Sequence, residues 1–441
     1  MTGNRDAVLR SVDEAGVRFV RLWFTDVAGF LKSFAITVDE LEAALSEGLS
    51  FDGSVIQGYS RVQEADMLAV PDPTTFEVLA WQGEDAAVAR MFCDICLPSG
   101  EPFPGDPRQV LRRNLERARR HGFTLHAGPE MEFFAFASAS DPSPIDQMGY
   151  FDQVTSEATS ALRKRSILAL EAMGVAVEYS HHEIAPGQQE IDLRPAEALT
   201  MADSIMTFRT IVKEVAHQMG VYATFMPKPL NGVNGSGMHT HLWLYEGDVN
   251  AFADRNAPDG LSVVCRRFMA GLLAHARAIT AITNPWVNSY KRLVPGYEAP
   301  VHVCWAHNNR SALVRVPAAP RGRLDRIGIE YRAPDPACNP YLALSVLVAA
   351  GLDGIERGLD LPDEAQDNLW ELEERDRRAL GIESLPGSLD EALDALEGSE
   401  LAAEALGEHV FAYVLANKRR EWQEYAGHVS QYELDRWLAL L

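Results

Sequence analysis

The sequence is poor in cysteine and has no long apolar run. Its five cysteines, an odd number in 441 residues, are typical of a chain in a reducing compartment. The longest apolar stretch, residues 341–352, is interrupted by Ser345 and is too short to cross a membrane. The N-terminus lacks the basic and then apolar pattern of a secretory signal, so we expect a cytoplasmic protein without membrane contact.

Basic charge is also scarce, because the formal net charge is −23. Such a chain lacks the basic footprint of a nucleic-acid-binding protein, so we expect no nucleic-acid partner. Residues 291–332 are the exception, with eight Lys or Arg against three acids. This basic segment indicates a locally bound phosphate or carboxylate. Solvated surface positions are the simpler explanation for Arg321, Arg323 and Arg326, but not for Arg292, Arg310, Arg315 and Arg332.

Cys93 and Cys96 form a Cys-x-x-Cys phrase, which can belong to a redox or zinc site. They lie in an apolar segment, residues 88–97, that is typical of a strand. Their odd spacing sends the two side chains to opposite faces of a strand, so we expect two separate core cysteines.

The length of the chain favours two or more domains. Proline and glycine concentrate in residues 97–107, which we interpret as a linker that delivers Asp106 as the N-cap of a helix. Before it, the patterns predict paired strands at 17–24 and 31–36 and a helix at 39–47. After it, they predict helices at 107–121, 156–173, 199–219, 261–281 and 340–357, and short surface helices from about 359 to 400.

Between these helices, four short phrases carry carboxylates and imidazoles. They contain Glu130 and Glu132, then Glu183 and Glu190, then His239, and finally Glu330. Strand side chains alternate, so Glu130 and Glu132 share a face, as do Glu330 and Arg332. Carboxylates with one imidazole suit hard cations such as Mg²⁺ or Mn²⁺. Such a converging acid set would be unstable without metal, which favours a metal site over scattered surface acids.

The sequence has no Gly-x-x-x-x-Gly-Lys-Ser/Thr loop, which excludes a Walker-type nucleotide site. Phosphoryl transfer can instead use metals together with arginines that neutralise the phosphate oxygens.

These phrases stand among others that resemble glutamine synthetases of the bacterial class I short form. The further landmarks are Phe51-Asp-Gly-Ser54, Lys228-Pro, Asn234-Gly-Ser-Gly-Met-His239, Asn288 to Pro300, Asn309-Arg-Ser311 and Asn339-Pro-Tyr-Leu. The resemblance implies an α+β fold, with a small β-grasp-like N-terminal domain at 1–100 and a catalytic domain at 106–441. The catalytic domain would hold a curved antiparallel sheet flanked by helices. A dodecamer of two hexameric rings is also implied, with each active site shared between neighbouring subunits.

The resemblance assigns the metal ligands to two ions, Mg²⁺ or Mn²⁺, with ATP as the cosubstrate. Glu132, Glu183 and Glu190 would hold one ion. Glu130, His239 and Glu330 would hold the other. His181, His182 and His241 stay outside this ligand set.

Substrate contacts are implied in the same way. Arg310 and Arg315 correspond to phosphate-contacting arginines, and Arg292, Arg332, Asn234 and Gly235 to glutamate-binding positions. Because Arg310 and Arg315 are five residues apart, a turn at residues 309–311 must precede the strand. Asp52 would take a proton from ammonium across the subunit boundary, and Glu298 would close as a flap that excludes water. Tyr150 and Val55 would line the amine pocket.

Three positions depart from the family pattern, namely Pro195 for an aromatic residue, Trp243 for serine and Gly328 for a basic residue. All three lie around the nucleotide in the family, where the implied contacts here are Arg315, Glu178, His241 and Trp243. Trp243 shares a strand face with His239 and His241, so it either stacks on adenine or packs in the core.

The leading hypothesis is therefore an ATP-dependent glutamate–ammonia ligase that forms glutamine through γ-glutamyl phosphate. Val55, where ammonia-using relatives commonly have serine, keeps organic amines open, as in γ-glutamylpolyamine synthetases. A catalytically silent structural or regulatory relative is the third alternative, but it predicts eroded ligands, and the matched ligands are intact. A guanidino kinase shares the catalytic fold but does not need the Asp52 and Glu298 phrases.

Overall fold

The computed structural model describes residues 2–54, 56, 58, 66–79, 87–152, 157–319, 323–365, 375, 377 and 380–441. Two of the positions considered above, Val55 and Arg321, lie outside these residues.

The N-terminal part is a six-stranded sheet with the strand order β2-β1-β6-β4-β3 and β5 paired to β6. Its strands are β1 (Val17–Thr25), β2 (Leu31–Thr37), β3 (Leu49–Asp52), β4 (Asp66–Pro71), β5 (Glu77–Val78) and β6 (Ala87–Cys96). Helices α1 (Thr2–Ala15) and α2 (Leu41–Glu47) pack against it, and the short 3₁₀ turns η1 (Val38–Glu40) and η2 (Pro73–Thr75) lie between the strands. The predicted strand pair and helix are confirmed, whereas α1 was not predicted.

Strand β6 confirms the interpretation of the two cysteines. Cys93 and Cys96 are both free and buried, and Cys93 belongs to the N-terminal core formed around Leu22, Met91 and Ile95. They are core residues and not a paired thiol site.

The second part is built on a ten-stranded curved sheet, with the order β14-β15-β16-β12-β7-β9-β8. Its strands are β7 (Thr124–Phe136), β8 (Val177–His182), β9 (Gln188–Leu193), β10 (Ala196–Glu197), β11 (Tyr222–Thr224), β12 (Thr240–Glu246), β13 (Val249–Asn250), β14 (His302–Ala306), β15 (Ala312–Arg315) and β16 (Ile329–Tyr331). The described pairs are antiparallel except for the parallel pair β14–β15. The α+β fold class is confirmed.

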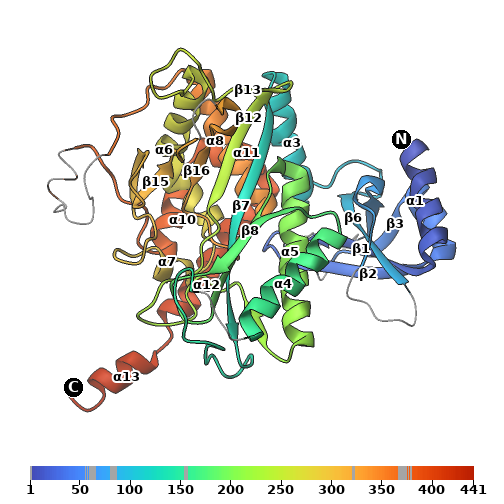
Figure 1. Ribbon diagram of the computed structural model, residues 1–441, viewed down its shortest axis with the longest axis horizontal. Coiled ribbons are helices and arrows are strands. Elements are labelled where there is room, and N and C mark those ends of the chain that lie inside the picture. Colours follow the sequence, from blue (N-terminus) through green and yellow to red (C-terminus); the bar gives the residue numbers. More distant parts are fainter. Residues whose placement is uncertain are drawn as a thin grey trace.

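Helices cover this sheet and contribute most of the large core (Figure 1). They are α3 (Pro107–Arg120), α4 (Glu157–Ala172), α5 (Ala198–Gln218), α6 (Val263–Thr283), α7 (Ser289–Arg292), α8 (Pro340–Arg357), α10 (Leu389–Glu397), α11 (Glu400–Leu406), α12 (Glu408–Ala426) and α13 (Gln431–Trp437), with the 3₁₀ turn η3 (Leu324–Arg326) before β16. The five long helices that the sequence predicts are confirmed to within about two residues. Helix α10 is less superficial than predicted, because it buries Leu389, Leu393 and Leu396.

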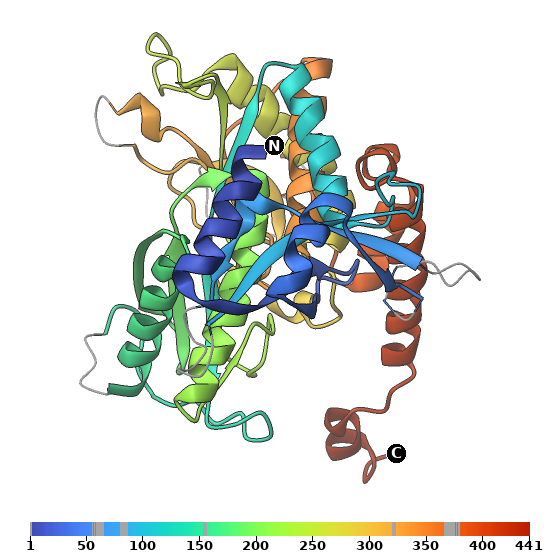
Figure 2. The same cartoon turned by 90° about the vertical axis from the view of Figure 1, so that its right-hand side faces the viewer.

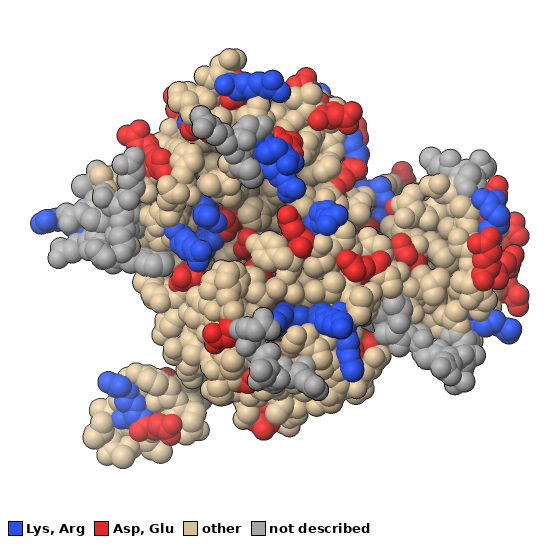
Figure 3. All heavy atoms as spheres, in the orientation of Figure 1, with Lys and Arg blue, Asp and Glu red and all other residues tan. Residues whose placement is uncertain are grey.

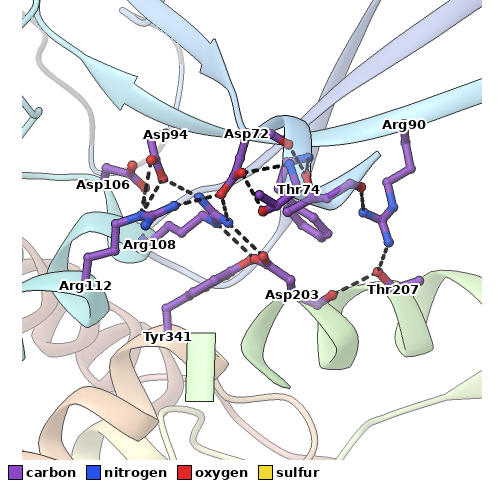
Figure 4. A network of polar contacts seen from close by, with 12 residues as sticks. Asp72, Thr74, Arg90, Asp94, Asp106, Arg108, Arg112, Asp203, Thr207 and Tyr341 are labelled. Atoms are coloured by element: carbon purple, nitrogen blue, oxygen red, sulfur yellow. Dashed lines mark hydrogen bonds and ion pairs between the residues drawn. The ribbon is translucent and has the colours of Figure 1, made fainter. Parts of the chain in front are cut away.

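Residues from both parts meet in a buried polar network at their junction (Figure 4). Arg108 of α3 forms ion pairs with Asp72 at 2.9 Å, Asp94 at 2.5 Å and Asp203 at 2.9 Å. Tyr341 of α8 donates a hydrogen bond to the same Asp203 at 2.6 Å. Because the arginine and its acids come from both parts, this network holds the small sheet against α3, α5 and α8.

Asp106, just before this network, confirms the predicted start of α3. Its carboxylate accepts hydrogen bonds from the backbone N–H of Arg108 at 3.0 Å and of Ile95 at 2.9 Å. One side chain therefore caps the helix and ties it to β6.

The C-terminal helix α13 projects away from the body of the molecule (Figures 1 and 2). It leaves large apolar side chains in contact with solvent, including Tyr432 at 62% and Trp437 at 42% exposure. Among the described residues, no helix is long and apolar enough to span a membrane.

Candidate active site

The site lies along the middle of strand β7. Strand β12 pairs with one edge of β7 up to Pro129, and β9 pairs with the opposite edge from Glu130 onward. Beyond β12, the backbone of the 234–239 phrase runs alongside β7, because the Glu130 N–H donates to the His239 carbonyl at 2.9 Å. Glu130 and Glu132 therefore lie between two chain segments that both carry site residues.

One group of ligand atoms forms around Glu130. Glu130, His241 and Glu330 bring one ligand atom each to within 4.8 Å of the others. His239 joins them, with its Nδ1 2.9 Å from a Glu130 oxygen and 3.6 Å from a Glu330 oxygen. The strand register explains the grouping, because His241 lies opposite Glu330 on β16 and opposite Gly128 on β7.

A second group forms on the other side of β7. His181, Glu183 and Glu190 bring one ligand atom each to within the same 4.8 Å limit. The carboxylate of Glu132 faces this group from β7 and accepts hydrogen bonds from Gln188 at 2.7 Å and from the Gly237 backbone at 3.0 Å. His182, the residue after His181, does not face this group. It is buried, and its Nε2 forms a hydrogen bond with Asp146 at 2.9 Å.

The electrostatics of the second group are those of uncompensated buried acids. Burial and repulsion from Glu183 raise the pKa of Glu132 well above its ordinary value. Burial and repulsion from Glu132 do the same to the pKa of Glu190. A bound divalent cation would remove this repulsion, and the donor set of carboxylates with imidazole fits a hard cation such as Mg²⁺ or Mn²⁺.

The first group is partly neutralised by its histidines and arginines. Burial opposes ionisation of Glu130, but hydrogen bonds with His239 and His241 hold its pKa well below the ordinary value. Burial likewise opposes the charge of Glu330, and Arg332 lowers the pKa of this carboxyl.

Four arginines surround these acids. Arg332 and Arg315 both pair with Glu330, the latter at 2.9 Å. Arg292 is buried beneath the 234–237 phrase and donates to the Ala333 carbonyl at 2.7 Å. Arg310 is exposed in the turn before β15, where Ser311 donates to Asn309 at 2.9 Å, as the spacing from Arg315 predicted.

A cavity of about 170 Å³ joins the two groups. The predicted site residues that line it are Glu130, Glu132, Tyr150, Glu183, Glu190, Asn234, Gly235, His239, Arg292, Glu298, Arg310, Arg315, Glu330 and Arg332. Acids and arginines thus face one small space. On the surface seen in Figure 3, acidic and basic side chains are interspersed over the body of the molecule, and no large area of one sign appears in this view.

His241 and Trp243 lie next to the cavity residues, and Glu178 does not line the cavity. His241 reaches Glu130 at 2.8 Å, and Trp243 stands next to His241 on β12 with the rings 5.9 Å apart and nearly parallel. Glu178 of β8 is exposed and pairs with Arg326 at 3.6 Å.

Asp52 is not brought to the cavity by its own chain. It ends β3 of the N-terminal sheet, is fully exposed, and accepts a hydrogen bond from the Ser54 backbone at 2.8 Å.

Two of the departures from the family pattern, Gly328 and Trp243, lie in direct contact. A Cβ atom added at Gly328 would lie 2.4 Å from the indole Nε1 of Trp243, so a side chain at 328 and the indole compete for one space. Pro195 has a similar relation to Gly128, where an added Cβ would lie 2.9 Å from the proline ring. Gly328 and Trp243 are therefore sterically coupled, whereas Pro195 packs against Gly128.

The sequence did not predict an aromatic group that lines the cavity beside Glu183 and Glu190. Phe151, Tyr179 and His181 line the cavity with Tyr150. The Tyr150 and Phe151 rings stack at 4.1 Å, and both meet His181 edge-on. Alternation along β8 puts Tyr179 and His181 on one face and could have indicated this pair. The position of Phe151, which has a positive φ of 59°, has no such signal.

Two family models together match most of the chain. Residues 16–98 match the glutamine synthetase β-grasp domain, and residues 104–437 match the glutamine synthetase catalytic domain. The chain belongs to the glutamine synthetase family. The glutamine synthetase of Mycolicibacterium smegmatis is 54% identical over 446 residues, covering 100% of both chains. The glutamine synthetase of Thermus thermophilus is 48% identical and covers 98% of both chains.

Solved structures agree with this assignment. A structure titled "GmaS/ADP complex-Conformation 1" has a TM-score of 0.86 at 32% identity, over 98% of this chain and 99% of that one. The Plasmodium falciparum glutamine synthetase has a TM-score of 0.89 at 25% identity, over 98% of both chains. The protein is therefore an ATP-dependent ligase of a family that joins glutamate to ammonia and uses divalent metal.

Proposed function

We propose that this glutamine synthetase family member converts glutamate, ammonia and ATP into glutamine, ADP and phosphate, with the cavity between β7, β8 and β12 as its reaction site. The observation that carries the proposal is the set of six carboxylates and four arginines around a cavity of about 170 Å³. Carboxylates that face one another can bind divalent cations. Arginines can bind the phosphate of ATP and the carboxylates of glutamate.

Two Mg²⁺ or Mn²⁺ ions would be held by the predicted ligands. Glu132, Glu183 and Glu190 form one set, and Glu130, His239 and Glu330 the other. The proximity of His181 to the first set and of His241 to the second makes these imidazoles additional candidates. The ions would supply charge neutralisation for the phosphates and for the γ-carboxylate.

The arginines and the backbone orient the reactants. Arg292 and Arg332, with Asn234 and Gly235, would grip the glutamate, so that its γ-carboxylate oxygen attacks the terminal phosphorus of ATP and ADP leaves. Arg310 and Arg315 would offset the negative charge on the phosphoryl oxygens. His241, Trp243 and Glu178 would contact the remainder of the nucleotide.

The second step needs a base and a dry site. The nitrogen of the amine attacks the acyl carbon of γ-glutamyl phosphate, and phosphate leaves as the amide forms. Asp52 would take the proton from ammonium, while Glu298 would cover the intermediate and exclude water. Because Asp52 lies away from the cavity of its own chain, this role requires a neighbouring subunit.

A homo-oligomer, the dodecamer of two hexameric rings, would supply that neighbour in the cytoplasm. The exposed apolar side chains of α13 support association, since such surface is costly in water. Light scattering would test it, because a monomer has a mass of 48.7 kDa.

An organic amine is the second candidate for the amine substrate. Tyr150, Phe151, Tyr179 and His181 offer ring faces and edges beside Glu183 and Glu190. Aromatic rings together with carboxylates favour alkylammonium ions, which gain cation–π contact and lose less hydration than ammonium.

The test is phosphate release from ATP and glutamate with each of several amines, together with measurement of the amide product. The proposal predicts glutamine as the product and the highest kcat/KM with ammonium. An organic amine with a tenfold higher kcat/KM, which corresponds to about 1.4 kcal/mol, would replace ammonia while keeping the ligase chemistry. No amide product with any amine would contradict the proposed function.

A further inference from the structure

Lys228 lies outside the ligands and substrate contacts named above, yet it contacts three segments that carry them. It follows β11 in the loop that leads to Asn234. Its backbone is fixed on both sides by one side chain: the Lys228 N–H donates to Asn288 Oδ1 at 2.7 Å, and Asn288 Nδ2 donates to the Lys228 carbonyl at 3.0 Å. Asn288 is the residue before α7, the helix that carries Arg292.

The side chain of Lys228 extends toward the cavity from this fixed backbone. Its Nζ donates to the carbonyl of Val233, the residue immediately before Asn234. The same ammonium stands over the ring of Tyr297, 3.9 Å from the ring centroid. One cation therefore contacts both the loop of Asn234 and the residue next to Glu298.

The segment of Tyr297 and Glu298 is under local backbone constraint. Glu298 has a φ of 57°, a left-handed conformation that costs free energy for a residue with a side chain. Its carbonyl accepts a long hydrogen bond of 3.5 Å from Arg332. Lys228 contacts the residue immediately before Glu298 through the Tyr297 ring.

The environment favours a strong cation–π contact. Lys228 is half-buried, and burial together with the nearby charge of Arg292 lowers its pKa. A partly dehydrated ammonium interacts more strongly with a ring than a solvated one.

We propose that Lys228 is a positioning residue that couples the glutamate-binding loop to the flap of Tyr297 and Glu298. The proposal rests on the proposed function, because it assumes that Asn234 contacts glutamate and that Glu298 covers the acyl phosphate. Glutamate that orders the loop would, through Lys228, also hold the flap in place.

Loss of this coupling has a chemical consequence. With the flap loose, a water oxygen attacks the acyl carbon of γ-glutamyl phosphate, the acyl C–O(P) bond breaks, and glutamate and phosphate are released. ATP is then consumed without amide formation. The diagnostic quantity is the ratio of phosphate released to amide formed, which equals one when the flap excludes water.

The experiment compares Lys228→Met, which keeps the length without the charge, with Lys228→Arg and Tyr297→Leu. Lys213→Met is the matched control. The Lys213 Nζ lies 5.7 Å from the centroid of the Phe225 ring, and Lys213 does not line the site cavity. We expect Lys228→Met and Tyr297→Leu to raise the ratio and the KM for glutamate by roughly three- to tenfold, the range of one partly desolvated cation–π contact. Lys228→Arg should recover most of the coupling, and Lys213→Met should keep a ratio of one.

A ratio of one in both Lys228→Met and Tyr297→Leu, with the wild-type KM for glutamate, would overturn the coupling role. An equal rise in Lys213→Met would also overturn it, because the effect would then be general destabilisation. Failure of the proposed function is distinguishable, since the wild-type protein would itself form no amide.

Discussion

Glu132 of β7 and Glu190 of β9 lie directly opposite each other in an antiparallel register. Like charges at such positions destabilise a sheet, and both carboxyls are buried. Burial raises both pKa values well above the ordinary value, together with repulsion from Glu183 at Glu132 and from Glu132 at Glu190. A divalent cation bound between the two carboxylates would attract both of them and offset their repulsion, so the pair is consistent with a cation site.

We therefore expect Mg²⁺ or Mn²⁺ to raise the thermal unfolding midpoint of the wild-type protein by several degrees, and EDTA to reverse the change. Glu190→Gln removes one charge of the pair, so its metal-free midpoint should equal or exceed that of the wild type while the metal response shrinks. Differential scanning fluorimetry measures both. A metal response in Glu190→Gln as large as in the wild type would argue against this site.

The aromatic group beside Glu183 leads to a prediction about amine choice. Phe151 is 61% exposed and stacks on Tyr150, so Phe151→Ala removes a ring without opening the core. If the rings serve alkylammonium ions, kcat/KM for methylamine and putrescine should fall by about threefold to tenfold while that for ammonium stays nearly constant. Equal losses for ammonium and the organic amines would remove the basis for an organic amine substrate.

Gly328 and Trp243 predict a double-mutant result that follows from the proposed contact of Trp243 with the nucleotide. Gly328→Lys forces the indole away, since an added Cβ already meets it at 2.4 Å, and nucleotide affinity should fall by about tenfold or more. Trp243→Ser alone should weaken binding through lost stacking by a smaller factor. In the combination of both changes the clash disappears, so affinity should exceed that of Gly328→Lys. Strict additivity, measured by calorimetry with ADP, would contradict the steric coupling.

Asp106 predicts a pH dependence of stability at the domain junction. Burial and the nearby charge of Asp94 raise the pKa of Asp106 to about 7 against the opposing hydrogen bonds and charge of Arg108. Asp72, Asp203 and Arg112 complete the charged surroundings. Because the folded state holds the proton more tightly, this contribution to stability is full below about pH 4 and is lost as the pH rises through about 7.

Asp106→Asn keeps a good N-cap without the charge. With metal present, its unfolding midpoint should fall less than that of the wild type between about pH 5 and about pH 8. Parallel midpoint curves for the two proteins would show that Asp106 does not titrate in this range.

Short-range patterns were sufficient to predict part of the site. Glu130 and Glu132 share a face because strand side chains alternate, and the Asp106-Pro107 pair marks a helix start, so both appear in the sequence alone. The sequence does not indicate His181 and His241 as ligands, because their proximity to the acids depends on strand register. The same holds for Gly328, whose role is visible only beside Trp243.

Other features depend on contacts that local patterns do not encode. Helix α1 was not predicted because its core contact rests on few residues, chiefly Val8 and Val12, within a polar segment. Asp52 faces solvent in its own chain, so its predicted catalytic role depends on a second subunit. Lys228 is one residue of a landmark phrase, and its link to Tyr297 follows only from the fold.

The central claim is that the acid set and the arginines form one metal-dependent ligase site. The most direct test measures phosphate and glutamine together from ATP, glutamate and ammonium for the wild type, Glu132→Ala and Glu330→Ala. We predict equal amounts of phosphate and glutamine in the wild type with Mg²⁺ or Mn²⁺, and no detectable turnover in either variant with any amine. Near-normal turnover in both variants, or wild-type turnover that persists in EDTA, would contradict the account.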